Sequence, residues 1–545
     1  MNHLFITGFM GAGKSTVGQL VAAQLGWPFA DTDAVIERRE GATVSQVFSE
    51  RGEDGFRAAE HAALESLVAQ EPSVIATGGG VVLRPDNQAL LKRMGTVVYL
   101  SVTPEEALAR LGDAGDRPLL AGGGLAAAQS ILEPRLALYR ATADHVVETT
   151  GRTASEVAEE MIAVLRGSEE RVVSVGTAAD AYEVRVGAGL LSHVGDRIRE
   201  VTGTASAALV SDATVHSLYG ERVAASLRDA GVRLSEHVVP AGEPSKSWER
   251  AGMLLEEFAQ GGLDRSSVVI ALGGGVVGDL AGFCAATYMR GVPLFHVPTT
   301  LLAQVDSSVG GKTGVDLRAG KNLAGAFWPP QLVLADTETL QTLPAAEWTN
   351  GLVEMAKAAL LQGGGALDRF EGALTPLLWR EPSAVAAAVW DAVAFKASVV
   401  TSDLRESGMR ECLNLGHTLG HALELVTGYG TLSHGLAVAE GMRFAARLAE
   451  SVSGAAAETT ARTVGLLDAV GAGEAICTDA LAPLAAVLAP PAVLAAMKSD
   501  KKSREGAVRF VLVRAPGQWQ TEVVSDEILL EELGRWVSRL EGREA

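Results

Sequence analysis

The chain has 545 residues, too many for one compact core, so two to four domains are expected. Its 48% hydrophobic and 21% charged composition is that of an ordinary globular protein, and its net charge of −20 argues against non-specific nucleic-acid binding, which needs a basic surface. The three cysteines are widely spread and odd in number, which argues against a disulfide framework and favours a reducing compartment.

The N-terminal segment and the hydropathy pattern favour a cytoplasmic protein. The first residues lack a basic leader and Lys14 interrupts their apolar run, so they are not typical of a signal peptide. The Ala-rich stretch Ala480–Ala496 comes closest to a membrane span, but Pro483, Pro490 and Pro491 interrupt it. We therefore expect small-molecule ligands, and neither nucleic acid nor a membrane as a partner.

The first predicted strand, Leu4–Thr7, leads into the run Gly8-Phe9-Met10-Gly11-Ala12-Gly13-Lys14-Ser15, and a helix-forming segment, Thr16–Gln24, follows. This is G-x-x-x-x-G-K-[ST] between a strand and a helix, which predicts a phosphate-binding loop. Its glycines let backbone N–H groups surround phosphate oxygens. Lys14 can reach the β- and γ-phosphates, and the Ser15 hydroxyl can hold Mg²⁺. The residues expected to bind ATP are Gly11, Ala12, Gly13, Lys14, Ser15 and Thr16.

Two carboxylates, Asp31 and Asp33, follow the apparent strand Trp27–Ala30. Alternation along a strand would put both side chains on one side. One could then support Mg²⁺ through water while the other accepts a proton from a substrate hydroxyl. Taken alone, the pair fits a helix N-cap equally well.

Three arginines follow at wide spacing in a short segment. Arg57 lies beside Glu60, Arg117 opens an Arg-Pro-Leu-Leu loop, and Arg135 precedes Tyr139 by one helical turn. A run of three glycines, 78–80, comes directly after the predicted strand Val74–Ala76. Guanidinium groups bind carboxylate and phosphate through two parallel hydrogen bonds, so this set favours an anionic substrate.

Taken in this order, the motifs of residues 1–166 resemble shikimate kinase, where the phosphate loop alone would leave gluconate and nucleotide kinases open. The resemblance implies a three-layer α/β/α P-loop kinase domain that phosphorylates the 3-hydroxyl of shikimate with ATP. It assigns substrate binding and the role of base to Asp33, and Mg²⁺ support to Asp31. Further implied residues are Arg57, Arg135 and Gly79 at the substrate carboxylate, Arg117 at the transferring phosphoryl group on a lid over Gly112–Gly124, and Arg110 near the adenine.

A polar break, Gly167-Ser168-Glu169-Glu170, separates this segment from a new strand pattern that starts at Arg171–Val175. We expect domains over residues 1–167 and 168–545. Within the second, strands and helices alternate over about 171–340, and from about 345 to 545 the pattern is almost entirely helical.

The predicted strand Val268–Leu272 runs into Gly273-Gly274-Gly275-Val276-Val277-Gly278-Asp279, which fits G-x-G-x-x-G and suggests a dinucleotide site. The usual acidic residue about 20 positions later is missing, and Leu294–Thr300 stands there instead. An ordinary Rossmann fingerprint is therefore disfavoured, and a simple Gly-rich turn is the default interpretation.

Two histidines, His417 and His421, stand four residues apart on one predicted helix face, a spacing that suggests a zinc pair. The metalloprotease version needs Glu directly after the first His, and Thr418 stands there instead. The candidates for a third ligand are His434 and Glu354.

With Pro240–Lys246, Tyr288–Gly291, Gln304–Lys312 and Lys321-Asn322, these motifs make residues 171 to 515 resemble 3-dehydroquinate synthase. The resemblance implies conversion of 3-deoxy-arabino-heptulosonate 7-phosphate to 3-dehydroquinate and phosphate, with NAD⁺ used catalytically. It implies an α/β NAD-binding lobe and a helical metal-binding lobe. It also revises the histidine pair: the implied Zn²⁺ ligands are Glu354, His417 and His434, with Co²⁺ or Fe²⁺ as alternatives.

The same resemblance implies the remaining site residues. Glu406 and His421 would accept protons. The implied NAD⁺ residues are Asp212, Glu243, Lys246, Gly274, Gly275, Asp279, Thr299, Thr300, Lys321 and the segment Thr339–Thr342, which begins at Thr339 and ends at Thr342. The implied substrate residues are Arg290, Asp306, Lys312, Asn322, Lys357, Lys396, Arg410, Asn414 and one lysine of the pair Lys501 and Lys502, with Lys501 preferred.

Arg290 would be donated across the interface of a homodimer formed by this part of the chain. One residue departs from the family pattern, because Leu436 stands where a Glu usually follows His434-Gly435. The chain as a whole is thus expected to be a bifunctional enzyme. The alternatives are that one part is a non-catalytic module, or that the second part serves as another sugar-phosphate cyclase or a metal-dependent alcohol dehydrogenase.

Overall fold

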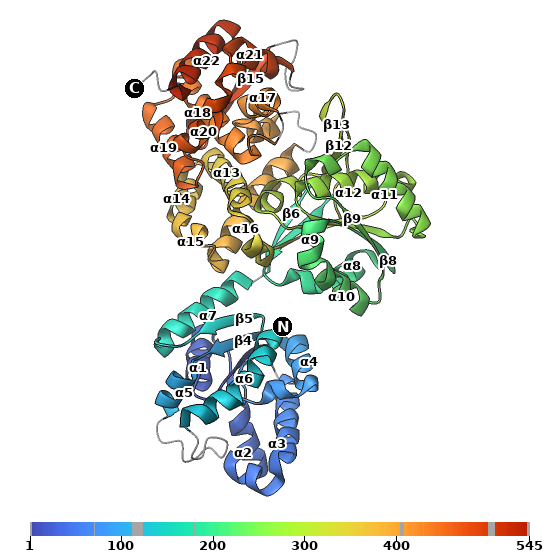
Figure 1. Cartoon of the computed structure of the whole chain (residues 1–545), viewed down its shortest axis with the longest axis vertical. Coiled ribbons are helices and arrows are strands. Elements are labelled where there is room, and N and C mark those ends of the chain that lie inside the picture. The colour runs from blue at the N-terminus through green and yellow to red at the C-terminus, as the bar shows by residue number, and fades with distance from the viewer. Residues whose placement is uncertain are drawn as a thin grey trace. The chain divides into compact units, whose positions relative to one another are not determined.

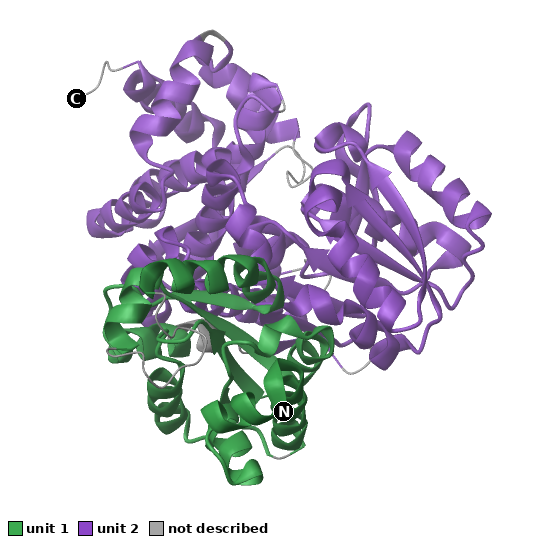
Figure 2. Ribbon diagram, turned by 60° about the horizontal axis from the view of Figure 1, so that its bottom comes forward, with its two compact units in different colours: residues 1–166 green, residues 167–545 purple. Residues whose placement is uncertain are grey.

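The computed structural model describes residues 3–69, 71–111, 124–168, 170–177, 180–403, 408–428, 430–499 and 507–541. The chain divides into two compact units, residues 1–166 and 167–545, which are called unit 1 and unit 2 below (Figure 2). Each unit has its own sheet and its own apolar core.

Unit 1 is built on a five-stranded parallel sheet in the order β2-β3-β1-β4-β5. The strands are β1 (His3–Gly8), β2 (Phe29–Asp31), β3 (Val74–Ala76), β4 (Gly95–Ser101) and β5 (His145–Glu148). β1 and β3 are buried along their whole length, which explains their continuous apolar runs. Because the strands are parallel, their carboxyl ends share one edge of the sheet, and the phosphate loop follows the central strand there.

Helices connect these strands (Figure 1). They are α1 (Lys14–Leu25), α2 (Thr32–Glu40), α3 (Val44–Val68), α4 (Pro85–Met94), α5 (Pro104–Leu111), α6 (Gly124–Thr142) and α7 (Ala154–Ser168), with a short 3₁₀ turn at Val81–Leu83. α3 starts with a capping box between Thr43 and Gln46 and changes direction at Gly52.

Unit 2 begins with a seven-stranded sheet in the order β6-β7-β14-β11-β10-β8-β9. Only the pair β6–β7 is antiparallel. The strands are β6 (Arg171–Val175), β7 (Tyr182–Gly187), β8 (Ser206–Asp212), β9 (Arg233–Val239), β10 (Val268–Gly273), β11 (Leu294–Pro298) and β14 (Leu332–Asp336). A separate hairpin, β12 (Lys312–Leu317) with β13 (Gly320–Phe327), packs beside α12.

The helices of this lobe are α8 (Val194–Thr202), α9 (Ala213–Val215), α10 (Glu221–Asp229), α11 (Trp248–Gln260) and α12 (Gly275–Thr287). Short turns η4 (Leu190–His193), η6 (Glu243–Ser245), η7 (Tyr288–Arg290) and η9 (Thr337–Thr342) are 3₁₀, while η5 (His216–Gly220) and η8 (Ala303–Ser307) are π-helical. A π turn often marks a functional segment, and η8 contains Asp306.

The rest of unit 2 is mainly helical. It contains α13 (Ala345–Gln362), α14 (Gly364–Gly372), α15 (Leu374–Leu378), α16 (Pro382–Ser402), η10 (Met409–Asn414), α17 (His417–Thr427), α18 (His434–Ser453), α19 (Ala457–Ala469), α20 (Glu474–Leu481), η11 (Ala482–Val487), α21 (Pro490–Ser499) and α22 (Asp526–Leu540). One apolar cluster joins Val184 of the sheet to Leu352, Leu419 and Trp536 of the helices, so the two lobes share a core. The α/β fold class predicted from the sequence is confirmed, but the hairpin β15 (Val508–Ala515) with β16 (Gln518–Val524) was not predicted.

One helix of the described chain, α16, is long and apolar enough to cross a membrane by length and composition alone. The bent pair Glu474–Ala485 and Pro490–Ser499 passes the same test if it is counted as one span. The sequence analysis did not single out α16. Half of its most apolar window is buried within unit 2, where it packs against β6 and α13, and a core helix passes the same test.

Candidate active sites

The phosphate loop of unit 1 is built around glycines that no other residue could replace without strain. Gly8, Gly11 and Gly13 have φ values of 147°, 79° and 90°. A Cβ on Gly11 would lie 2.5 Å from the Ala107 carbonyl oxygen. The loop therefore packs closely against α5, and the Lys14 ammonium donates a hydrogen bond to the Phe9 carbonyl oxygen at 2.9 Å.

Asp31 connects the phosphate loop to α2. The Ser15 hydroxyl donates to Asp31 Oδ2 at 2.5 Å, and the Asp33 N–H donates to Asp31 Oδ1 at 2.9 Å. The expectation of strand alternation over this pair is wrong, because β2 ends at Asp31 and Asp33 lies in the first turn of α2. Asp31 caps the N-terminus of α2 and also accepts the hydrogen bond of Ser15. The N-cap role and the proposed role in Mg²⁺ support are therefore compatible. The oxygens of Ser15 and Asp31 form a suitable pair for Mg²⁺.

Arg57 is held in a buried ion pair on α3. Its Nη1 donates to Glu60 Oε2 at 2.8 Å, and neither side chain is more than 10% exposed. Burial raises the pKa of Glu60, and Arg57 only partly offsets this. Glu60 Oε1 has no hydrogen-bond partner among the described residues. No role was predicted for Glu60 from the sequence, although its spacing of three residues from Arg57 on one helix indicates a contact between them.

The glycines 78–80 bring these side chains close to the phosphate loop. A Cβ on Gly78 would lie 2.5 Å from Glu60 Oε1 and 3.0 Å from Asp33 Oδ1. A Cβ on Gly79 would lie 3.6 Å from the Met10 amide nitrogen. The carboxylates of Asp33 and Glu60 therefore lie beside the loop that follows β1.

Arg135 approaches the same turn from α6. Its Nη1 donates to the Gly79 carbonyl oxygen at 3.1 Å, and the Tyr139 hydroxyl donates to the same oxygen. Tyr139 stacks on Tyr99 with ring centroids 4.9 Å apart, which fixes its orientation. Arg110 lies elsewhere, after β4, where it donates to the Thr149 carbonyl oxygen at 2.5 Å. Arg117 and the expected lid lie outside the described residues, apart from Gly124 at the start of α6.

In unit 2, the Gly-rich turn forms a close cradle at the N-terminus of α12. A Cβ on Gly274 would lie 3.1 Å from Thr300 Cγ2, and one on Gly275 would lie 3.1 Å from Ser307 Oγ. The Thr299 hydroxyl is buried and has no hydrogen-bond partner among the described residues. A helix N-terminus preceded by a glycine turn, with an unpaired hydroxyl beside it, suits the pyrophosphate and ribose of a dinucleotide, so the residues fit NAD⁺.

Four expected NAD⁺ residues form one ionic network beside this cradle. Lys246 Nζ lies 3.1 Å from Glu243, 3.3 Å from Asp279 and 3.9 Å from Asp316, and Lys321 lies 3.3 Å from Glu243. Burial raises the pKa of Asp279 to about 6, although Lys246 opposes the shift.

The remaining expected NAD⁺ residues have local structural partners. Asp212 caps α9, and Thr300 Oγ1 accepts the Ala303 N–H at 3.1 Å. The Thr339 hydroxyl donates to the Asp336 carbonyl oxygen at 2.7 Å, and Thr342 pairs with Tyr219. These hydrogen bonds fix the segments after β8, β11 and β14.

A cavity of about 520 Å³ holds most of the expected substrate residues. Lys396 on α16 contacts Asp306 Oδ1 at 2.5 Å, and Lys357 on α13 donates to the Leu413 carbonyl oxygen at 2.8 Å. Burial lowers the pKa of Lys396, and Asp306 opposes this. The cavity lining includes Asp306, Lys312, Asn322, Lys357, Lys396, Arg410, Asn414 and His417. Four cations around one cavity suit a substrate with a phosphate and a carboxylate.

Among the described residues, the expected Arg290 and His421 do not line this cavity. Arg290 is exposed at the end of η7, with a φ of 70°, and does not line the cavity of its own chain. Glu406 and Lys501 lie outside the described residues.

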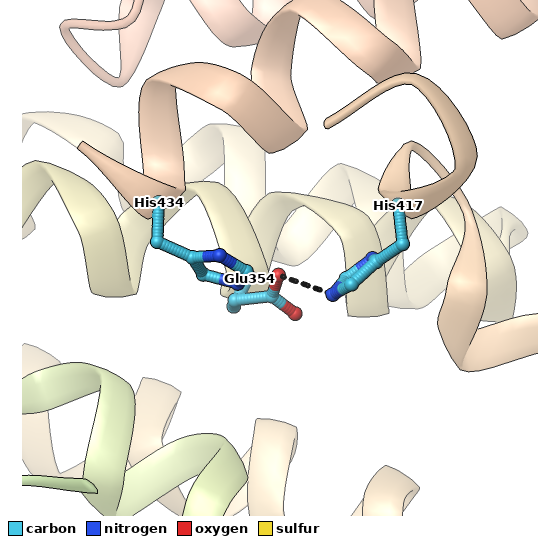
Figure 3. Close-up of side chains that lie close together, drawn as sticks. All are labelled: Glu354, His417 and His434. Atoms are coloured by element: carbon cyan, nitrogen blue, oxygen red, sulfur yellow. Dashed lines mark ion pairs between the residues drawn. The ribbon is translucent and has the colours of Figure 1, made fainter. Parts of the chain in front are cut away.

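Glu354, His417 and His434 come together from three helices, α13, α17 and α18 (Figure 3). Their ligand atoms lie within 4.8 Å of one another, and His417 Nε2 is 3.9 Å from Glu354 Oε1. Glu354 Oε1 is buried without a hydrogen-bond partner among the described residues, while Oε2 pairs with Lys357. Two imidazoles and one free carboxylate oxygen fit Zn²⁺ or Co²⁺ with a position left for substrate oxygens.

His421 is not part of this group. Its ring centroid lies 5.2 Å from that of His417 at an angle of 89°. The i, i+4 spacing therefore does not mark a pair of ligands here. Leu436 packs against the apolar core of unit 2, and the carboxylate near His434 comes instead from Glu424, 3.5 Å away. The sequence analysis gave Glu424 no role, although it follows His417 by seven residues on one helix face.

Both units match known families. Residues 10–166 match the model of shikimate kinase, residues 236–350 that of the N-terminal part of 3-dehydroquinate synthase, and residues 351–503 that of its C-terminal part. The 3-dehydroquinate synthase of Symbiobacterium thermophilum is 44% identical over 342 residues, which is 62% of this chain and 93% of the relative.

Two solved structures are similar to parts of the chain. The 2-epi-5-epi-valiolone synthase from Streptomyces hygroscopicus, with NAD⁺ and Zn²⁺ bound, has a TM-score of 0.59 and 29% identity, covering 68% of this chain and 99% of its own. The shikimate kinase from Acinetobacter baumannii in complex with shikimate is 37% identical, with a TM-score of 0.30, and the match covers 30% of this chain and 93% of that one.

Proposed function

The chain belongs to the 3-dehydroquinate synthase family and carries a shikimate kinase domain before it, and from this premise we propose how its residues perform the two reactions. Unit 1 has shikimate kinase activity, and unit 2 has 3-dehydroquinate synthase activity. We place the boundary between the two domains at residues 167 and 168.

In the kinase domain, Lys14 and the loop amides of Gly11–Ser15 bind the ATP phosphates, and Ser15 with Asp31 would hold Mg²⁺. Arg57 and Arg135 bind the shikimate carboxylate. Asp33 orients the 3-hydroxyl and accepts its proton, while Mg²⁺ would neutralise charge on the phosphates. The observation that carries this assignment is the position of Gly78 and Gly79, which connect the phosphate loop to Asp33 and Arg135.

The kinase assignment is tested by changing its proposed base. Asp33→Asn should lower kcat for ADP formation with shikimate, ATP and Mg²⁺ by about 10² to 10⁴-fold. Dehydroquinate formation by the same protein should be unchanged and serves as its control. An unchanged kcat for ADP formation would rule out Asp33 as the base.

In the synthase domain, the cavity cations bind the phosphate and carboxylate of the heptulosonate. Glu243, Lys246, Asp279 and Lys321 hold NAD⁺, which when bound accepts and returns a hydride. Glu354, His417 and His434 would hold a divalent metal, which when bound polarises a substrate hydroxyl.

Once the substrate is bound, His421 and Glu406 accept and return protons, and the buried charged groups Lys357, Lys396 and Arg410 that line the cavity interact more strongly than they would in water. The observation that carries the assignment is that His417 lies in both the metal-ligand group and the cavity lining.

Removal and return of the metal tests the synthase assignment. A chelator should abolish phosphate release from the heptulosonate phosphate, and Zn²⁺ or Co²⁺ should restore it. Glu354→Gln should retain neither activity nor stoichiometric metal. Full activity in a preparation shown to contain no metal would contradict the proposal.

We also propose a cytoplasmic homodimer in which Arg290 completes the cavity of a second copy. The exposure of Arg290 and its absence from its own cavity support this. Arg290→Ala and Lys396→Ala proteins should each be inactive, and their mixed dimers should regain activity because one site then has both residues. If mixing after dissociation restores nothing, Arg290 does not act across an interface.

A further inference from the structure

Glu424 of α17 faces a proposed metal ligand on the neighbouring helix. Its Oε1 lies 3.5 Å from Nδ1 of His434, and its side chain is 12% exposed. Burial acts to raise the pKa of Glu424, but the contact with His434 and the nearby His421 and Lys321 together lower it. None of the roles assigned above to the two reactions uses this carboxylate.

The two histidines of the site are oriented by different groups. His417 Nδ1 lies 3.2 Å from the Leu415 carbonyl oxygen, and its Nε2 is the atom near Glu354. His434 has no backbone carbonyl in this role among its described contacts, and its Nδ1 is directed at Glu424. A neutral imidazole with an acceptor at Nδ1 carries its proton there and leaves Nε2 free to bind a metal.

Close packing of α17 against α18 fixes the distance between Glu424 and His434. A Cβ on Gly441 would lie 1.9 Å from the Gly416 carbonyl oxygen, and a Cβ on Gly420 would lie 3.1 Å from the Ala437 carbonyl oxygen. These glycines let the two helix backbones approach more closely than larger residues would allow. The contact between Glu424 and His434 is therefore set by two rigid elements and not by a loop.

We propose that Glu424 is a positioning residue of the metal centre, which accepts the Nδ1–H of His434 and holds its Nε2 toward the metal. The inference rests on the metal site assigned above to Glu354, His417 and His434. A carboxylate in this position also makes the imidazole a stronger ligand. Glu424 thus allows α17 to provide one ligand directly and to orient another on α18.

Metal affinity of the full chain tests the proposal. Zn²⁺ is titrated into the metal-free protein against a chromophoric chelator. Glu424→Gln should weaken Zn²⁺ binding by about 10-fold and Glu424→Ala by up to about 100-fold, the range found when such partners are lost. With Co²⁺ in place of Zn²⁺, the visible absorption bands of Glu424→Gln should shift.

The matched control is Glu371→Gln, which removes a carboxylate paired with Arg462 at 2.7 Å in the same unit. It should leave the Zn²⁺ affinity and the Co²⁺ spectrum unchanged. Wild-type affinity and spectrum in Glu424→Gln would overturn the positioning role. The positioning role would also be overturned if metal-free Glu424→Gln melts at a lower temperature and the stability it has lost is as large as its loss in free energy of Zn²⁺ binding. That result would mark a structural role for Glu424. A wild-type protein that binds no metal would instead overturn the metal site itself.

Discussion

His296 is a buried titratable residue in the centre of the unit 2 sheet, and it makes folding sensitive to acid. Its side chain packs against the Gly-rich turn, where a Cβ on Gly278 would lie 3.3 Å from its ring. Burial lowers the pKa of His296 from 6.5 to about 4. Between these values the unfolded state holds the proton and the folded state does not. The stability contributed by neutral His296 is therefore present above pH 6.5 and lost as the pH falls toward 4.

We predict that His296→Asn reduces this loss. From pH 7.5 to 4.5, the wild-type free energy of unfolding should fall by about 2 to 3 kcal/mol more than that of the variant, at 1.36 kcal/mol per pKa unit. Urea unfolding followed by tryptophan fluorescence measures it, because of the eight tryptophans only Trp27 lies in unit 1. Parallel pH profiles for the two proteins would show that His296 is not responsible.

Gly80 makes room for the Arg57 guanidinium, which the proposed kinase site needs. A Cβ on Gly80 would lie 2.0 Å from Arg57 Nη1, and Glu60 restrains the guanidinium from moving away. We predict that Gly80→Ala raises the KM for shikimate by about 10- to 100-fold, the loss of one hydrogen bond to a charged group. Steady-state kinetics should show an unchanged KM for ATP in the same variant. An equal rise in both values would point to general damage.

For single residues, the sequence indicated which side chains belong to a site better than it indicated where they lie in the fold. Lys14, Ser15 and the loop glycines follow from one local spacing, and the structure puts them at the expected strand end. Asp33 and Glu354 depend on contacts between distant segments, which no local pattern contains. His421 shows the same limit, because i, i+4 spacing predicts a shared helix face but not which of two histidines meets Glu354 on another helix.

At the proposed metal site, α17 and α18 pack closely, and a Cβ on Gly441 would lie 1.9 Å from the Gly416 carbonyl oxygen. We predict that Gly441→Ala destabilises unit 2 by about 1 to 3 kcal/mol, the usual effect of overpacking, and weakens Zn²⁺ binding because the helices must separate. Gly465→Ala on α19 is the control, since a Cβ there meets nothing within 4 Å, and it should stabilise by about 0.5 to 1 kcal/mol. Melting temperatures of the metal-free proteins test this. Similar shifts in both variants would exclude a packing effect.

Element prediction succeeded where burial produces a simple pattern. The strands Val74–Ala76 and Arg171–Val175 were predicted with the observed bounds, and the first is wholly buried. The hairpin of β15 and β16 was missed, because its second strand, Gln518–Val524, has mostly half-buried residues and no clear alternation. The break between α13 and α14 shows the same limit: Gly363 is buried and α14 begins at Gly364, because Gly363 fits against Pro516 of the distant hairpin.

The whole molecule consists of two units with separate apolar cores, and this bears on why the activities share a chain. The kinase core is formed by residues such as Phe5, Val98 and Tyr139, and the largest synthase core by residues such as Leu352, Leu419 and Trp536. Among the described residues, neither core includes residues of the other unit. Each proposed active site is likewise formed from residues of one unit. The synthase site differs only in that its Arg290 is proposed to come from unit 2 of a second copy.

We therefore predict that residues 1–167 and 168–545, produced as two chains, each retain the kcat and KM of the fused protein. The synthase product must be dehydrated and reduced before it becomes shikimate, so it cannot pass directly from one site to the other. In a mixture containing the two missing enzymes, the separate chains at equal concentration should give the same flux from the heptulosonate phosphate to shikimate 3-phosphate as the fused chain. A large fall in flux with unchanged individual rates would show that fusion transfers intermediates. Equal flux would leave a fixed one-to-one ratio of the two activities as the consequence of fusion.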